Sequence, residues 1–233
     1  MDFLTSPLGW KNWLLLISAL INLGMAIFIL SRGVKNKINL YFSLLALSCF
    51  GWGTSLFVSL AFFDLTVSKF FFQTSYLSAW FISVFLFYFI FYFPFPTRVI
   101  KKIHRNIIIG VSIAISFVVY TKTHILDFGR INNAHEVYVT YFKPFYILYS
   151  LLFIAMVCYS LYILWSKYVN IESHFKLGTK LLFITILIGL VVGAYFDLFL
   201  DYFDIHSYIW VGPIFTIPMN LVVFYLVAFN RKQ

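Results

Sequence analysis

Charged residues are scarce in this sequence, and their scarcity excludes several classes of protein. Of the 233 residues only 11% are charged and 62% are hydrophobic, and the mean hydropathy is +0.93. Globular chains are about 45–50% apolar and about 25% charged. A soluble domain cannot hide so much apolar surface, and a disordered chain contains far less of it. The composition therefore excludes a soluble enzyme and a disordered protein, and it predicts a polytopic membrane protein.

The positions of cysteine and lysine exclude two further classes of protein, a disulfide-stabilised secreted domain and a retinal pigment. Cys49 and Cys158 both lie within apolar runs, which argues against the disulfide framework of a small secreted domain. No lysine occurs between Lys180 and Lys232, so a retinal pigment with a Schiff-base lysine in its last helix is excluded. The net charge of +9 does not indicate nucleic-acid binding, because the basic residues fall in short loops where membrane topology accounts for them.

Long apolar runs are what the sequence has in abundance. A helix that crosses a bilayer needs roughly 20 apolar residues. We predict an all-α bundle of seven transmembrane helices that forms a single domain over residues 1–233. The helices are expected at about 12–30, 38–61, 70–93, 106–120, 144–165, 181–200 and 209–229. Between the fourth and fifth helices, the segment His135–Tyr141 has strand character and predicts a small extracytoplasmic hairpin at about 122–142.

The distribution of basic residues predicts the orientation. Twelve of the 17 Lys and Arg residues follow the first, third, fifth and seventh predicted helices, whereas six of the eight acidic residues lie on the opposite side. Loops rich in Lys and Arg are cytoplasmic, so we expect the N-terminus outside and the C-terminus in the cytoplasm. Seven spans leave no room for a catalytic domain of about 100 residues, so we expect neither an enzyme nor a bound cofactor.

Two carboxylates stand near the outer end of the sixth predicted helix. Asp197 and Asp201 lie four residues apart and so share one helix face. Carboxylates this close to lipid are unfavourable unless they are solvated, paired or protonated. One hypothesis is a site for a cation, a proton or a ligand. The other is a solvated helix end that pairs with basic residues of the outer loops, namely Lys122, Arg130 or Lys143.

Aromatic and polar side chains on other helices extend this candidate site. An apolar pocket with a few placed polar groups is typical of sites that bind small molecules. The predicted ligand-binding residues are Trp52, Gln73, Tyr76, Trp80, Tyr146, Tyr149, Asp197, Asp201 and Trp210.

Three outer histidines suggest zinc binding or pH sensing, but they lack the spacing of metal ligands and we predict no metal site; they are His124, His135 and His206. Gly189 and Gly193 form a small-residue pair that predicts close helix packing.

Motifs at both ends of the chain carry a family resemblance. Asn22-Leu-Gly precedes the basic turn Arg32-Gly-Val-Lys-Asn-Lys, and Asn39-Leu-Tyr-Phe-Ser-Leu-Leu is followed by Trp52. Val211-Gly212-Pro213 opens the last predicted helix, and Asn230-Arg231-Lys232 follows it. With these motifs the chain resembles the N-terminal seven-transmembrane sensor region of bacterial histidine kinases over nearly its whole length.

The resemblance implies a sensor or receptor module of a two-component system in the inner (cytoplasmic) membrane. The last helix would pass an extracytoplasmic or intramembrane signal to a cytoplasmic output of the histidine-kinase or cyclase type. The implied partners are the lipid bilayer, a small or lipophilic ligand, the output domain or partner protein, and a second copy in a homodimer. Because the sequence ends at Gln233, before any kinase segment, we expect this chain to be either the sensor part of a longer receptor or a stand-alone member of the family. A small-solute transporter or channel is the alternative, although no repeat or mid-membrane charge indicates it.

Overall fold

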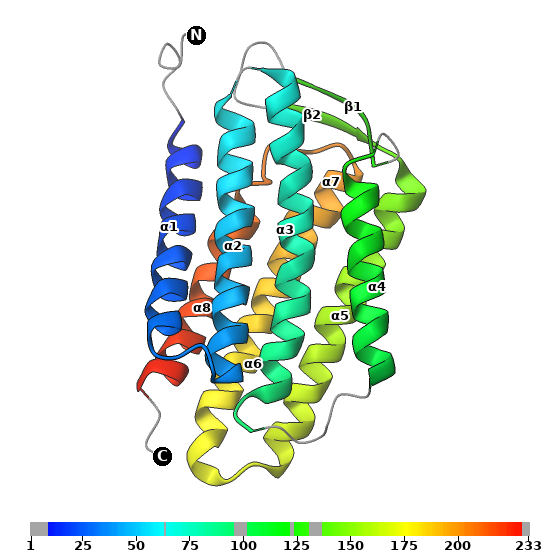
Figure 1. Ribbon diagram of the computed structural model, residues 1–233. Helices are drawn as coiled ribbons and strands as arrows, with labels where there is room; N and C mark the ends of the chain where they lie inside the picture. Colours follow the sequence, from blue (N-terminus) through cyan, green and yellow to red (C-terminus); the bar gives the residue numbers. More distant parts are fainter. Residues whose placement is uncertain (1–8, 63, 96–101, 122–123, 131–136, 230–233) are drawn as a thin grey trace.

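The computed structural model describes residues 9–62, 64–95, 102–121, 124–130 and 137–229, whose helices run up and down in one bundle (Figure 1). Seven helical stretches among these residues are long and apolar enough to cross a membrane. Six of them are α1 (Trp10–Ser31), α2 (Lys37–Ala61), α3 (Leu65–Tyr92), α4 (Lys102–Val119), α5 (Lys143–Asn170) and α8 (Val211–Phe229). The predicted all-α bundle of seven membrane-spanning helices is confirmed.

The sixth span is built from three consecutive pieces. α6 (Ser173–Gly193) continues into a π-helical segment, η1 (Ala194–Phe199), and then into the single turn α7 (Leu200–Tyr202). π-helical turns are rare and often occur at functional sites. Because η1 contains Asp197 and α7 contains Asp201, the irregular part of this span carries both candidate carboxylates.

Polar side chains explain why two helices extend beyond the ranges expected from the sequence. α3 begins at Leu65 because the Asp64 carboxylate caps it, accepting hydrogen bonds from the backbone N–H groups of Thr66 and Val67 at 2.8 and 3.0 Å. α5 runs past Trp165 and includes Lys167, whose side chain is buried. The Lys167 Nζ donates to four backbone carbonyls where α3 ends, at 2.7–2.9 Å; they belong to Ile90, Phe91, Phe93 and Phe95. Lys167 therefore lies within a helix and fixes α5 to the end of α3.

A two-stranded hairpin covers one end of the bundle. β1 (Ile125–Arg130) pairs antiparallel with β2 (Val137–Tyr141), as the strand pattern predicted. Side chains of β2 alternate between buried and exposed, with Tyr141 on the buried side. The Lys69 Nζ of α3 donates to the Ile125 carbonyl at 3.2 Å and ties the hairpin to the bundle. The hairpin lies at the end where α1 begins, and α8 ends at the opposite end (Figure 1).

Buried apolar side chains form two clusters along the bundle. One lies toward the hairpin and includes Phe72 and Tyr149, and the other lies toward the end of α8 and includes Phe42 and Val223. Trp52 of α2 packs against both clusters. The candidate site lies at this level of the bundle, where the two clusters meet.

Candidate functional site

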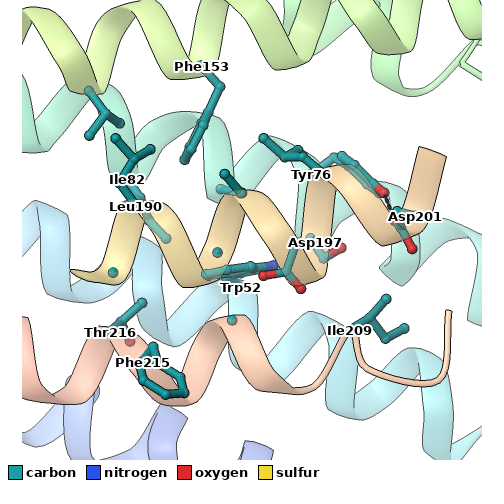
Figure 2. Close-up of a pocket in the computed structure, with 18 of the residues that line it drawn as sticks. Trp52, Tyr76, Ile82, Phe153, Leu190, Asp197, Asp201, Ile209, Phe215 and Thr216 are labelled. Carbon is teal, nitrogen blue, oxygen red and sulfur yellow. Dashed lines mark hydrogen bonds between the residues drawn. The ribbon is translucent and has the colours of Figure 1, made fainter. Parts of the chain in front are cut away.

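A cavity of about 100 Å³ opens among α2, α3, α5, the α6–η1–α7 stretch and α8 (Figure 2). A single buried water needs only about 10–15 Å³, so this space suits an organic group. Its walls are mostly apolar, and their large side chains include Trp52, Leu56, Phe72, Ile82, Phe153, Leu190, Phe215 and Met219. The cavity thus combines apolar walls with two acidic side chains, Asp197 and Asp201.

The structure brings five of the nine predicted site residues to the wall of this cavity. They are Trp52, Tyr76, Tyr149, Asp197 and Asp201, contributed by α2, α3, α5, η1 and α7. Tyr146 lies just behind the wall, where its hydroxyl donates to the backbone carbonyls of Asp197 and Leu198 at 3.1 and 3.0 Å. Tyr146 therefore supports the irregular η1 segment.

The other three predicted residues lie outside the lining of this cavity. Trp80 is buried, and its indole N–H donates to the Ser112 hydroxyl of α4 at 3.0 Å. Gln73 is buried on α3. The Trp210 ring packs edge-on against Trp10 at a centroid distance of 5.0 Å. Trp80 and Trp210 thus make contacts at other points of the bundle, with α4 and with Trp10.

Asp201 is the centre of a buried hydrogen-bond network. The residue is 1% exposed, and its Oδ2 accepts from the Tyr76 hydroxyl at 2.5 Å and from the Tyr141 hydroxyl at 2.8 Å. The Asp201 Oδ1 lies 2.7 Å from the His206 Nδ1. Burial and the neighbouring Asp201 raise the pKa of Tyr141 well above its usual value, so this hydroxyl keeps its proton. Asp201 thereby joins α3, β2 and the segment before α8.

His206 extends the network to the hairpin backbone. Its Nε2 lies 3.3 Å from the Val139 nitrogen and 3.2 Å from the Val139 oxygen. A neutral imidazole accepts from the Val139 N–H, and a protonated one donates to the Val139 carbonyl. Although burial acts to lower the pKa of His206, the hydrogen bond and charge of Asp201 outweigh it, and the pKa is raised. His206 thus fastens the edge of β2 in either protonation state.

The described partners of Asp201 differ from the loop cations that the sequence offered. Lys143, one of those cations, donates instead to the Tyr202 carbonyl at 3.4 Å. Lys122 and the side chain of Arg130 lie outside the described part of the structure. For Asp201 the hypothesis of a solvated helix end is therefore wrong, because tyrosine and histidine hold the carboxylate inside the protein.

Asp197 has a very different environment. Its Oδ2 is buried and has no hydrogen-bond partner. The carboxylate lies against Gly212 of α8, where an added Cβ would overlap it and would come within 2.7 Å of the Trp52 ring. A side chain at position 212 would have to displace the Asp197 carboxylate, so the glycine allows α8 to pack closely against η1. Figure 2 shows Asp197 beside Trp52 among the residues that line the cavity.

The small-residue pair on α6 has a different role from the expected one. Gly189 and Gly193 both line the cavity. A Cβ on Gly189 would have its nearest neighbour, the Phe215 carbonyl oxygen, at 3.9 Å, which is ordinary contact. These glycines leave space for the cavity, and the close approach that we expected from them occurs at Gly212.

Two features of the hairpin end of the bundle were not foreseen from the sequence. Tyr141 completes the Asp201 network, but it lies 60 residues away in the chain and in a segment predicted only as a hairpin. His206 was a candidate for metal binding or pH sensing with several acidic residues in reach, and its specific pairing with Asp201 was not singled out. No group of three His, Cys, Asp or Glu side chains suited to a metal ion occurs among the described residues, which do not include His135.

The fold and the cavity define a class: a seven-helix membrane protein with an internal, mostly apolar cavity. A family model described as the N-terminal 7TM region of histidine kinase matches residues 14–231. The chain belongs to this family, which makes it a membrane sensor module. No curated protein and no solved structure matches the chain.

Proposed function

We propose that this chain is the sensing part of a receptor in the inner membrane. A small or lipophilic ligand occupies the cavity, and α8 transmits the change to a cytoplasmic output of the histidine-kinase or cyclase type. In this proposal the chain has no catalytic role of its own, and two copies act together as a homodimer. The observation that carries the proposal is that α8 forms a wall of the cavity and is also the last helix of the bundle.

Contacts along α8 support a path from the cavity to the far end of the bundle. Thr216 of α8 lines the cavity and accepts a hydrogen bond from the Asn22 amide of α1 at 3.2 Å. One turn further, the Asn220 amide donates to the Asn22 Oδ1 at 2.6 Å. Near the end of α8, the Arg32 guanidinium donates to the Ala228 carbonyl. A ligand that displaces Thr216 therefore acts on a helix whose position is set by polar contacts with α1 and its following turn.

Spin-label distances test this transmission. Labels are placed at lipid-facing Leu221→Cys on α8 and Tyr162→Cys on α5, in a Cys158→Ser background and in lipid nanodiscs. With n-octanol as the probe, we expect the distance between the labels to shift by about 1–2 Å, as helices do in switching proteins. The matched control is Gly189→Leu, whose side chain fills the cavity and should abolish the response to octanol. An unchanged distance with octanol bound would contradict transmission through α8 and favour the transporter alternative.

Cysteine accessibility tests the proposed orientation. We place the hairpin outside the cell and the turn between α1 and α2 in the cytoplasm, because the turn is basic. A membrane-impermeant maleimide applied to intact cells should label Tyr138→Cys on β2. It should label Lys35→Cys only after the membrane is permeabilised. Reversed labelling would overturn the orientation without affecting the fold.

A further inference from the structure

The polar groups around the cavity indicate which ligand it takes. We propose that it binds an organic ammonium cation whose nitrogen lies against the Asp197 carboxylate and whose apolar body fills the space between α3, α6 and α8. This inference rests on the proposed sensor function and specifies the ligand class of the same site.

The surrounding tyrosine hydroxyls leave Asp197 without a donor. Tyr76 and Tyr141 donate to Asp201, while Tyr149 donates to the Tyr76 backbone carbonyl at 2.8 Å. The Tyr146 hydroxyl reaches the Asp197 backbone carbonyl but not its carboxylate. These four tyrosine hydroxyls are therefore engaged elsewhere, and the buried Asp197 Oδ2 remains without a hydrogen bond.

The described part of the chain supplies no cation to the cavity either. Neither lysine, arginine nor histidine occurs among the described residues that line it, whereas two aspartates do. A buried carboxylate without a partner is unfavourable, most of all at membrane depth. A ligand that brings a positive charge and N–H donors forms a charge-assisted hydrogen bond and removes this penalty.

The walls favour an organic cation over a metal ion. Calcium and magnesium need six or more oxygen ligands. The carboxylate of Asp201 is already held by Tyr76, Tyr141 and His206, which leaves Asp197 as the one described lining carboxylate without a hydrogen bond. Aromatic rings attract ammonium groups through their π-faces, and four large rings other than tyrosine line the cavity. They are Trp52, Phe72, Phe153 and Phe215.

Equilibrium binding to the full chain in lipid nanodiscs tests the inference. The probes are radiolabelled n-octylamine, n-octanol and n-octanoate, and empty nanodiscs give the amount that dissolves in the bilayer. We expect octylamine to bind at least about tenfold more tightly than the other two, as a charge-assisted hydrogen bond allows. Asp197→Asn should remove this preference and leave octanol binding unchanged. Asp204→Asn removes an exposed acidic residue outside the cavity lining and should leave the preference intact.

A cavity-filling variant separates the failure of this inference from the failure of the sensor proposal. Gly189→Leu should weaken the binding of all three probes. If the three probes bind wild type equally and Gly189→Leu weakens them all, the cavity stands and the ammonium preference is wrong. An octylamine preference that persists in Asp197→Asn also overturns the inference. If Gly189→Leu has no effect, both proposals fall.

A second variant keeps the test decisive if Asp197→Asn does not fold. Gly212→Ala adds a methyl group where the Asp197 carboxylate now lies, so the carboxylate must move. We expect the same selective loss of octylamine binding from this variant. Octylamine binding at the wild-type level in well-folded Gly212→Ala would contradict a contact with Asp197 in its present position.

Discussion

Two aspartates one helical turn apart have opposite environments in this protein. Asp201 accepts hydrogen bonds from Tyr76 and Tyr141 and pairs with His206, whereas the Asp197 Oδ2 is buried without a partner. A carboxylate with all its donors in place fixes local structure, and one without donors is available to a ligand. We infer that Asp201 anchors the hairpin and that Asp197 is kept for recognition. In this proposal the same residue type serves stability at one position and binding at the other.

The largest expected effect comes from removing the satisfied carboxylate. Asp201→Ala leaves two buried tyrosine hydroxyls and the His206 Nδ1 without their acceptor, which should destabilise the protein by about 3 kcal/mol. The midpoint of thermal unfolding in detergent, followed by tryptophan fluorescence, should fall by roughly 5–10 °C. Asp204→Asn, at an exposed position, is the control and should change little. An Asp201→Ala midpoint equal to that of wild type would remove the distinction between the two aspartates.

A smaller effect is expected from the titration of His206. Asp201 raises the pKa of His206 in the folded protein, so the stabilisation is complete below pH about 6.5, the ordinary pKa of histidine, and is lost as the pH rises through the raised value. The loss is smaller than in Asp201→Ala because the neutral ring still accepts from Val139. The unfolding midpoint of wild type should therefore fall as the pH rises above about 6.5. His206→Gln should show a weaker dependence, and an equal dependence would contradict the assignment.

A second histidine, His124, also changes stability with pH, but it does so below pH 6.5, where His206 has little effect. His124 is buried among the rings of Tyr76, Tyr141 and Phe145. Burial lowers the pKa of His124 to about 4, so between pH 6.5 and pH 4 the unfolded chain takes up a proton that the folded chain does not. Acid should therefore destabilise wild type, and His124→Phe should lessen this effect. Taken together, the titrations of the two histidines predict that the folded protein is most stable near pH 6.5.

The sequence predicted the parts of this arrangement that depend on local pattern. Seven apolar runs predicted the membrane-spanning helices, and the alternating pattern before Tyr141 predicted a strand of the hairpin. The four-residue separation of Asp197 and Asp201 predicted that they share one helix face. It did not predict which aspartate would be satisfied, because Tyr76 and Tyr141 lie 125 and 60 residues from Asp201. Side chains toward lipid and toward the bundle interior are equally apolar, so periodicity does not separate them.

The same limit explains the predicted site residues that fell outside the cavity. With 22% aromatic residues in the chain, an aromatic side chain at the right depth is weak evidence for a pocket. Trp80 and Trp210 have suitable depth but face α4 and Trp10. The absence of side chains at Gly189 and Gly193 is a better indication of the cavity, because small residues on one helix face leave room for either a neighbouring helix or a ligand.

The smallest change in stability is expected at the unsatisfied carboxylate. Asp197→Asn replaces a carboxylate whose buried Oδ2 has no hydrogen bond with a neutral group of nearly the same shape, so no hydrogen bond to Oδ2 is lost. Unfolding at pH 7 without ligand should show a midpoint equal to or slightly above that of wild type, in contrast with Asp201→Asn measured alongside. If Asp197→Asn instead destabilised the protein as much as Asp201→Asn, the Asp197 carboxylate would have to serve the fold itself. The proposal that Asp201 stabilises the fold while Asp197 serves ligand binding would then be wrong, even if both variants altered ligand binding.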